Sequence, residues 1–514
     1  MNVLEKLSPD FTMSPYQEFI HMTRYSRWLN DKNRRETWPE TVQRYIDFFV
    51  AERGQDERVK NVLQHDIASA IANMQVMPSM RTLMTAGEAL RRDHTAAYNC
   101  AFLAVDCLAA FSETLHILMN GTGVGFSCEY EDVNNIPALP SEFIDIDETI
   151  VVRDSKGGWA DGYKALIESL ALGMIPKIDY SKIRPAGAKL KTFGGRASGP
   201  EPLKHLYDYT IKMFRKHAGF KLTTTAVHDI MCSIGEIVVV GGVRRSALIS
   251  LSDLSDTSMS MAKINFAVES FEIIDETDDV WKIHLTMAKG QPVDPSYTVT
   301  LKKATQSWLY NNLCSAKSMP WYILEPQRAL ANNSVAYESK PSLEIFNQEW
   351  TSLINSKSGE RGMFNREAAR LQAAKYGRRP KNRKYGTNPC SEIILRNKQF
   401  CNLTEAIIRE NDTRETIREK VRIATIIGTL QATLTKFKFL SEGWTENTRE
   451  EALLGVSFTG IMDNTFMAGL ATKEEARNFL FNPEFNGDTR TALQDFLDEM
   501  REYAVEVNRE WAAI

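Results

Sequence analysis

The sequence predicts an α/β fold with a largely parallel sheet, preceded by a mostly helical N-terminal region. From about residue 96 onward, strand-like runs such as 98–103 and 453–458 alternate with segments whose apolar residues have helical spacing. A connection between parallel strands needs a crossover long enough for a helix, so this alternation favours a parallel sheet. Residues 14 to about 85 carry a mostly helical pattern instead.

The N-terminal region, which we assign to residues 1–90, contains two helical stretches. Pro39 suits the first turn of the second helix, because its fixed φ is already helical and its missing N–H is not needed there. The positions at helical spacing in the first stretch are Tyr16, Phe19, Ile20 and Thr23, and the apolar positions on one face of the second are Val42, Tyr45, Ile46 and Phe49.

The α/β domain is assigned to residues 91–514. The strand 98–103 is followed by a helix with Phe111, Leu115, Leu118 and Met119 on one face, and then by a glycine-rich turn into a further strand. Residues 264 to about 316 differ, because 280–285 and 297–301 alternate like exposed strands. We expect an insertion there.

An apolar stripe at helical spacing lies near residue 500, and it must pack on something. One alternative is a terminal helix docked on this chain, and the other is a polypeptide that has been cut short or split. The stripe comprises Leu493, Phe496, Leu497, Met500, Ala504, Val507 and Trp511.

Composition is that of a soluble globular protein. The 514 residues carry a formal net charge of −4, with 43% hydrophobic and 25% charged residues. This balance gives no reason to expect nucleic acid or a membrane surface as a partner. The polar start lacks the apolar core of a signal peptide, and we find no apolar run near the roughly 18 residues of a membrane helix. We expect a cytoplasmic protein.

The seven cysteines are scattered and form no CxxC motif. We therefore expect neither a zinc site nor a structural disulfide framework, and a disulfide that forms should be transient and catalytic.

One stretch, 386–395, concentrates chemically useful groups. Asn388, Cys390 and Glu392 are two residues apart, so an extended backbone would point them to one face and into one cavity. A cysteine in an apolar strand is most often inert core, but a carboxylate on the same interior face is rare unless it is paired or functional. A thiol to carry a radical, a base for a hydroxyl proton and an amide to orient a substrate suit one-electron chemistry. A second thiol, Cys401, follows.

The order of several motifs resembles the vitamin B12-dependent class II ribonucleotide reductases, of the monomeric type that reduces ribonucleoside triphosphates. The resemblance covers about residues 14–512, apart from the insertion. Its motifs are Tyr25–Trp28, Arg34–Glu36, Met77–Arg81, Asn99–Phe102, Gly241–Ala247, Asn332–Val335, Asn388–Ile393, Phe400–Leu403 and Leu454–Ser457.

The resemblance implies a ten-stranded α/β barrel with an internal finger loop for the radical cysteine, which allows Asn388 to Glu392 to lie on that loop rather than on a strand. Cys390 would then be the thiyl radical that takes the ribose 3′-hydrogen. Glu392 would be the base on the 3′-hydroxyl, and Asn388 would bind the substrate hydroxyls. Cys100 and Cys401 would deliver two electrons and end as a disulfide, which needs Cα atoms within about 4.4–6.8 Å.

The resemblance also implies adenosylcobalamin as the radical source, thioredoxin or a similar dithiol as reductant, and deoxyribonucleotides for DNA synthesis as products. No metal site is expected from the protein's own side chains. Cys107, Cys128, Cys232 and Cys314 match no motif, and we assign them to packing.

Nucleotide contacts are less specific. Ser79, Asn99 and the turn containing Gly121 and Gly123 resemble substrate-binding positions, with an ordinary turn as the alternative. Two loops resemble those through which a bound deoxynucleotide effector biases substrate choice, with a plain hairpin and solvated arginines as the alternative. Their candidate residues are Arg196, Gly241, Gly242, Arg244 and Arg245.

Two departures from the family leave three hypotheses open. The insertion separates motifs that are contiguous in the family, and the family's later strands, phosphate turn and C-terminal cysteine pair have no counterpart. The first hypothesis is that the chain is the N-terminal portion of a split reductase, completed by a second polypeptide. The second is a shortened reductase that a dithiol re-reduces directly. The third is a nucleotide-binding protein that has lost turnover. The sequence shows no ATP-cone-like segment, so we expect no overall shutdown by dATP.

Overall fold

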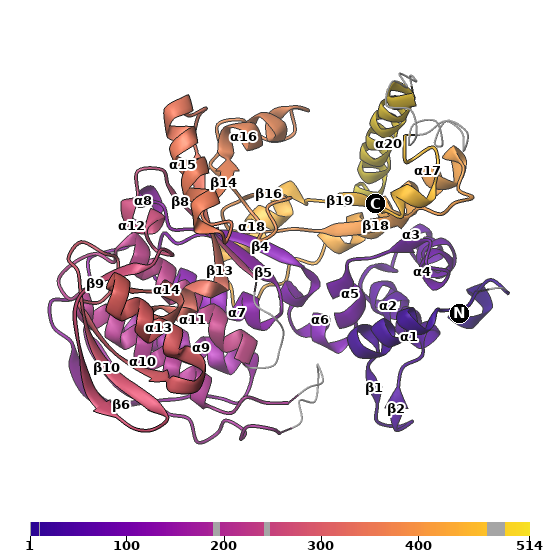
Figure 1. Cartoon of the computed structure of the whole chain (residues 1–514). Coiled ribbons are helices and arrows are strands. Elements are labelled where there is room, and N and C mark those ends of the chain that lie inside the picture. The colour runs from indigo at the N-terminus through magenta and orange to yellow at the C-terminus, as the bar shows by residue number, and fades with distance from the viewer. Residues whose placement is uncertain (1, 10, 189–195, 241–246, 470–488) are drawn as a thin grey trace. The chain divides into compact units, whose positions relative to one another are not determined.

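The computed structural model describes residues 2–9, 11–188, 196–240, 247–469 and 489–514 (Figure 1). These residues form two compact units. Unit 1 comprises residues 1–99 and 400–514, and unit 2 comprises residues 100–399. This division differs from the expected one at residue 90, because the segment after residue 399 groups with the N-terminal helices.

Unit 2 is built on a parallel sheet. Its strands follow the spatial order β14, β13, β8, β5, β4, and each neighbouring pair is parallel. The strands are short, and all but β14 at the edge are almost fully buried, as expected for a parallel sheet covered on its faces. Their bounds are β4 (Cys100–Ala104), β5 (Gly123–Ser127), β8 (Leu248–Asp253), β13 (Ala331–Tyr337) and β14 (Gly362–Asn365).

Four long helices lie in the connections from β4 to β5 and from β5 to β8 and pack on one another (Figure 1). The helix expected after the first strand is α7, and its predicted apolar residues Phe111, Leu115 and Leu118 are buried. Besides these helices, a parallel strand pair is formed by β6 (Ile144–Val151) and β7 (Met174–Asp179). The helices are α7 (Ala109–Met119), α9 (Lys156–Ala171), α10 (Glu201–Lys216) and α11 (Thr224–Val240).

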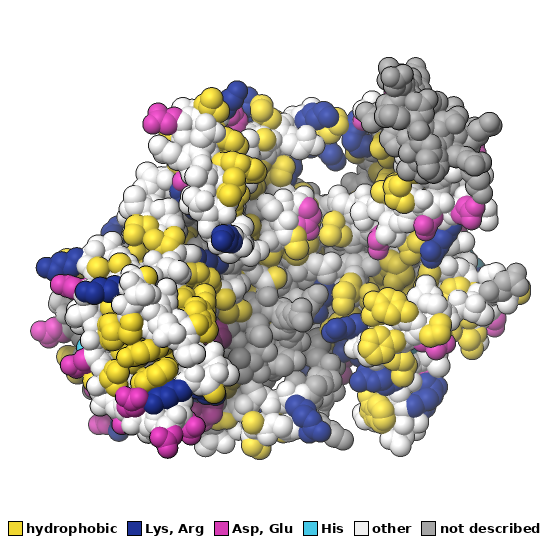
Figure 2. Space-filling view, viewed as in Figure 1, with side chains coloured by type: hydrophobic (Ala, Val, Ile, Leu, Met, Phe, Trp, Pro, Cys, Tyr) yellow, Lys and Arg dark blue, Asp and Glu magenta, His cyan; other side chains and the backbone are white. Residues whose placement is uncertain are grey.

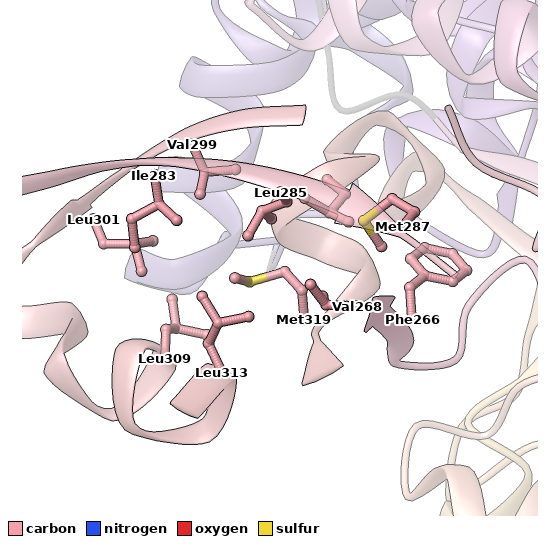
Figure 3. Close-up of a cluster of buried hydrophobic side chains, with 11 residues drawn as sticks. Phe266, Val268, Ile283, Leu285, Met287, Val299, Leu301, Leu309, Leu313 and Met319 are labelled. Atoms are coloured by element: carbon pink, nitrogen blue, oxygen red, sulfur yellow. The ribbon is translucent and has the colours of Figure 1, made fainter. Parts of the chain in front are cut away.

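The predicted insertion forms an antiparallel sheet with a core of its own (Figure 3). The expected alternation is present in β10, where Ile283 and Leu285 are buried while Lys282 and Thr286 are exposed. Helix α13 closes the core by packing Leu309 and Leu313 beneath the strands. The elements are β9 (Phe266–Glu276), β10 (Val280–Met287), β11 (Ser296–Lys302), α13 (Lys303–Ala316) and β12 (Ser318–Met319).

Unit 1 begins with the expected helices. Helix α2 starts with a capping box between Thr37 and Glu40, has Pro39 in its first turn, and buries the whole predicted stripe. The first stripe behaves differently, because Tyr16 and Phe19 are exposed. The N-terminal helices include α1 (Pro15–Ile20), α2 (Trp38–Arg53), α3 (Glu57–Val62), α4 (Ala68–Ala72), α5 (Met80–Thr85) and α6 (Glu88–Arg92).

The C-terminal part of unit 1 shows how the apolar stripe between Leu493 and Trp511 packs. Helix α20 (Thr489–Ala512) lies on α17 (Arg414–Ala432), and Phe496 and Met500 share a buried cluster with residues of α17. The stripe therefore packs on this chain. Next to α17 lies a sheet of order β19, β18, β3, formed by β3 (Val76–Met77), β18 (Leu403–Ile407) and β19 (Gly455–Thr459).

The α/β class is confirmed, whereas the closed ten-stranded barrel stays a prediction, because the described strands lie in separate sheets. One surface feature of unit 2 was not expected. Helix α15 (Leu343–Ser356) has no buried residue, and its Phe346 and Trp350 side chains are exposed. Figure 2 shows hydrophobic side chains at the surface in this part of unit 2. Among the described helices, none is both long and apolar enough to cross a membrane.

Candidate functional site

The cysteine motif lies in a β-hairpin loop of unit 2. Strands β15 (Tyr385–Thr387) and β16 (Ile394–Arg396) are antiparallel and carry the loop 388–393 between them. In the loop, the Ser391 N–H donates to the Asn388 carbonyl oxygen at 2.9 Å, and Ser391 has a positive φ of 66°. The prediction of one extended face is therefore wrong, because a left-handed residue breaks the alternation. The family resemblance had allowed a loop at this place.

Asn388 is the structural centre of the loop. Its side chain is 0% exposed, and its Oδ1 accepts the Ile393 N–H at 2.9 Å. Thr387 Oγ1 also donates to this oxygen, at 3.4 Å. These donors fix the orientation of the amide, and its Nδ2 is left buried without a hydrogen-bond partner in the described structure. A buried unpaired donor costs free energy, so this group is suited to bind an acceptor from a ligand.

Cys390 and Glu392 are exposed, which contradicts the expectation of a buried pocket around them. The turn at Ser391 explains this, because the chain reverses there and the residues on either side stand at the tip of the hairpin. Asn388 alone of the three lies in the interior.

Three reactive groups are nevertheless electrostatically coupled in unit 2. The pKa of the Cys390 thiol is raised above its usual value, first by partial burial of the sulfur, then by the carboxylate of Glu392 and by Cys100. A raised pKa keeps the hydrogen on sulfur at neutral pH, and a hydrogen atom can be transferred only from or to a thiol in that state. The structure therefore brings together Cys100, Cys390 and Glu392.

Close packing on the sheet places the hairpin beside Cys100. Cys100 is half-buried at the start of β4, opposite Gly123 of β5. A Cβ at Gly125 would overlap the Thr387 carbonyl oxygen, and one at Gly386 would overlap the Phe102 ring. Only glycine at these two positions lets the hairpin lie this close to β4 and β5.

The two predicted glycines of the α7–β5 turn have different roles. Gly121 follows the end of α7 with a φ of 81° and donates its N–H to the Leu118 carbonyl oxygen at 2.8 Å, as in an ordinary helix-ending turn. Gly123 faces the hairpin, because a Cβ there would lie 3.0 Å from Pro389 Cγ. Gly123 is thus part of the loop's packing surface, and substrate contact by either glycine stays a prediction.

The remaining predicted substrate residues lie in unit 1. Ser79 is buried, its N–H donates to Gln431 Oε1 at 3.0 Å, and its hydroxyl donates to the Ala97 carbonyl oxygen at 3.3 Å. Asn99 is half-buried and directly precedes Cys100 in the chain.

Cys401 is buried in unit 1. The pKa of Tyr98 is raised, chiefly by burial and further by Cys401, so the two side chains are neighbours. Tyr98 also stacks on Phe400, with ring centroids 5.0 Å apart. Cys100 belongs to the other unit, and its pairing with Cys401 stays a prediction.

The predicted effector loops are only partly described. Arg196 is exposed and donates to the Gly187 carbonyl oxygen at 2.9 Å. Gly241, Gly242, Arg244 and Arg245 lie outside the described residues. In the part of the chain that is described, no group of three or more His, Cys, Asp and Glu side chains is arranged to hold a metal ion.

A buried ion network at the base of the hairpin was missed by sequence reasoning. Arg366 is completely buried, and its guanidinium donates two hydrogen bonds to the Glu129 carboxylate, of 2.7 and 2.6 Å. Its Nε donates to the Tyr385 carbonyl oxygen at 2.7 Å, at the first residue of β15. Arg366 thus ties the hairpin to the carboxyl end of β5. The sequence signal is weak, because charged residues after strands are usually solvated.

Comparisons with known proteins show what this chain is similar to. Residues 2–88 match the family model described as the ribonucleotide reductase alpha domain. A solved structure, "crystal structure of B-12 dependent (class II) ribonucleotide reductase", shares the fold with a TM-score of 0.68 at 20% identity, covering 99% of this chain and 72% of that one. The chain thus has the fold of that reductase structure, and its first 88 residues resemble the ribonucleotide reductase alpha domain.

Curated relatives narrow the relationship. The adenosylcobalamin-dependent ribonucleoside-triphosphate reductase of Lactobacillus gasseri is 26% identical over 94% of this chain and 68% of its own length. The protein of the same name from Euglena gracilis is 25% identical over 79% of this chain and 50% of its own. The chain is therefore similar to the adenosylcobalamin-dependent branch, and it spans between half and about two thirds of these two relatives.

Proposed function

We propose that this chain reduces ribonucleotides, in particular ribonucleoside triphosphates, to 2′-deoxyribonucleotides by thiyl-radical chemistry, with adenosylcobalamin as cofactor. The observation that carries the proposal is the hairpin loop of unit 2. It combines a protonated thiol at Cys390, a carboxylate at Glu392 and an unpartnered buried N–H at Asn388, with a second thiol at Cys100 coupled to the first.

Among the residues of the loop, Cys390 is the one suited to react with the proposed cofactor. When bound, adenosylcobalamin supplies an organic radical that can take a hydrogen atom from a thiol. Cys390 is exposed at the tip of the loop, and its raised pKa keeps the S–H intact. A large cofactor can therefore reach the hydrogen that must be removed.

Each residue of the chain's own site then carries out a separate step of the reaction. The Asn388 Nδ2 donates to a substrate hydroxyl, and Cys390 as a thiyl radical takes the 3′-hydrogen. Glu392 accepts the 3′-hydroxyl proton, which makes loss of the 2′-hydroxyl as water easier next to the radical. Two thiols supply two electrons and two protons and become a disulfide, and Cys390 returns its hydrogen to the 3′-carbon.

We assign the electron-supplying thiols to Cys100 and Cys401. Within unit 1, the ring of Tyr98, two residues before Cys100, stacks on that of Phe400, one residue before Cys401. This stacking supports the pairing, because it brings together the two stretches of chain that lead to the cysteines. Thioredoxin or a similar dithiol would reduce the disulfide, and a deoxynucleotide effector would act through the loops around Arg196 and residues 241–245. A cytoplasmic location fits this proposal, because thiols are kept reduced there.

One observation indicates that further polypeptide contacts the loop 388–393. Cys390 and Glu392 are exposed, yet radical chemistry on a sugar needs a site from which water is excluded. We infer that further polypeptide covers the loop, either as a continuation of the chain or as a second polypeptide. The relatives are longer than the region they share with this chain, which supports this inference.

A turnover assay distinguishes a self-sufficient reductase, a split reductase and a nucleotide-binding protein without turnover. The chain is incubated with adenosylcobalamin, dithiothreitol and each ribonucleoside triphosphate, and 2′-deoxynucleotide is measured. Product from the chain alone supports a self-sufficient reductase. Product only after a complementing polypeptide is added supports a split reductase. Nucleotide binding without product under both conditions contradicts the proposal and favours a binding protein.

A further inference from the structure

A separate cavity of unit 2 lies at the junction between the helix pair α10–α11 and the insertion. Its volume is about 240 Å³, below the usual range of drug-sized ligand sites, so only a small molecule fits, and no residue of the loop 388–393 lines it. Its wall combines the last turns of α10, the first turn of α11, the segment Gln291–Asp294 of the insertion, and Glu325 and Arg328.

Two lysines form an anion-binding fork on one side of this cavity. Lys212 and Lys216 are four residues apart on α10 and therefore share a face. Their Nζ atoms bond to the two carboxylate oxygens of Asp294, at 2.8 and 2.6 Å. Burial acts to raise the pKa of Asp294, but the two lysines outweigh it and the pKa is lowered. The fork thus already holds one anionic group, supplied by the insertion.

The start of α11 adds further donors to the same cavity. Helix α11 begins at Thr224, and the Thr223 hydroxyl accepts the Ala226 N–H at 3.1 Å in the manner of an N-cap. The positive end of a helix dipole favours anions. Thr225 also lines the cavity, is only 7% exposed, and has a buried hydroxyl without a hydrogen-bond partner in the described structure. That unsatisfied hydroxyl points to a missing ligand.

The other acidic groups of the wall are already compensated. Arg328 holds Asp229 through two bonds of 2.7 and 2.8 Å. The pKa of Glu325 is raised, first by burial and then by Asp229, and its carboxyl accepts hydrogen bonds from Tyr297 and Gln327. Asp294 is therefore the main competitor of an incoming anion.

We propose that this cavity binds a small phosphate-bearing anion, whose phosphate replaces the Asp294 carboxylate between Lys212 and Lys216 beside the first turn of α11. Met213, Pro292 and Val293 offer an apolar wall for the rest of the molecule. Because Asp294 belongs to the insertion, binding at this site releases one contact between the insertion and α10. The proposal does not depend on the proposed reductase activity.

The test is a calorimetric titration of inorganic pyrophosphate into the full chain, without nucleotide or cobalamin. The double variant Lys212→Gln/Lys216→Gln should weaken binding by about tenfold or more, because two charge-assisted bonds are lost. Asp294→Asn should strengthen it severalfold, because the internal competitor loses its charge. Thr225→Val should weaken it severalfold through loss of the hydroxyl.

Lys164→Gln serves as the control, because Lys164 is an exposed lysine of α9 outside the cavity, in an i,i+4 pair with Glu168. Its pyrophosphate affinity should equal that of the wild type. The proposal is overturned if pyrophosphate does not bind, if the double lysine variant binds as the wild type does, or if Asp294→Asn binds more weakly. The lysines are exposed on a helix, so their replacement should leave the fold intact.

Discussion

The Ile393 N–H donates to the Asn388 Oδ1 at 2.9 Å, and this bond both closes the hairpin loop and fixes which end of the amide remains for a ligand. The carbonyl end of the side chain is used within the loop. The amino end is buried and has no partner among the described residues. One residue thus links the conformation of the loop to the proposed binding of a substrate hydroxyl.

Replacing Asn388 by alanine should therefore have two effects. The Ile393 N–H loses its acceptor, so the free energy of unfolding should fall by about 1–3 kcal/mol. Nucleotide affinity should fall by about tenfold, since a buried donor to the substrate is removed. Denaturant unfolding and equilibrium nucleotide binding measure the two effects. Thr387→Val is the matched control, because its 3.4 Å bond to the same amide is long and its loss leaves the Nδ2 in place. Equal effects of both variants would contradict this role of the amide.

Glu392→Gln should lower kcat by about 10²- to 10⁴-fold, the usual range for loss of a general base. It should also move the titration of Cys390. Burial, Glu392 and Cys100 together raise that thiol's pKa, so removing the carboxylate charge shifts it downward, toward the ordinary value. The rate of Cys390 alkylation is measured against pH, and the midpoint of this profile should be lower in Glu392→Gln than in the protein with Glu392. Both proteins also carry Cys314→Ser, which removes the other exposed thiol. An unchanged or higher midpoint would show that the two groups are not coupled.

Arg366→Met should destabilise the protein by about 3 kcal/mol, because the buried Glu129 carboxylate loses its two bonds to the guanidinium and keeps only the Ser127 hydroxyl at 2.7 Å and Lys384 at 3.7 Å. The double variant Arg366→Met/Glu129→Met removes both charges and should recover most of this loss. Thermal or denaturant unfolding of the three proteins measures the coupling. Additive losses in the double variant would mean that the two residues act independently.

Cys100→Ser and Cys401→Ser should each stop multiple turnover with a dithiol reductant while leaving nucleotide binding intact. Each change removes one sulfur of the proposed disulfide, so the disulfide cannot form and the pair of electrons that each reduction needs cannot be delivered through it. Product per chain over time measures this effect. Cys107→Ser, which changes another half-buried thiol of unit 2, should turn over normally. Normal rates in either of the first two variants would rule out the pair.

Much of the fold follows from local patterns. The alternation of strands and helices from residue 96 gives the parallel strands β4 and β5 with α7 between them, and the alternating apolar residues of the insertion give β10 and β11. The grouping of residues 400–514 with the N-terminal helices was not predicted. It depends on contacts between distant segments, which periodicity does not encode.

The residues of the candidate site were proposed from the sequence, and the structure changes their expected geometry. Motif order identified Asn388, Cys390 and Glu392, yet alternation along a strand gave the wrong directions for them. The failure comes from Ser391, a serine with positive φ, which carries no sequence signal of the kind that glycine provides. Arg366 was missed for a related reason, because an arginine that will be fully buried looks like any charged residue outside a strand.

The account depends on Cys390 as the residue that exchanges a hydrogen atom with the substrate. The direct measurement compares wild type and Cys390→Ser for 2′-deoxynucleotide formation, at matched nucleotide occupancy, with adenosylcobalamin, a dithiol and any complementing polypeptide that the wild type needs. The account predicts product from the wild type and none from Cys390→Ser, although both bind nucleotide equally. Sustained turnover by Cys390→Ser would contradict it.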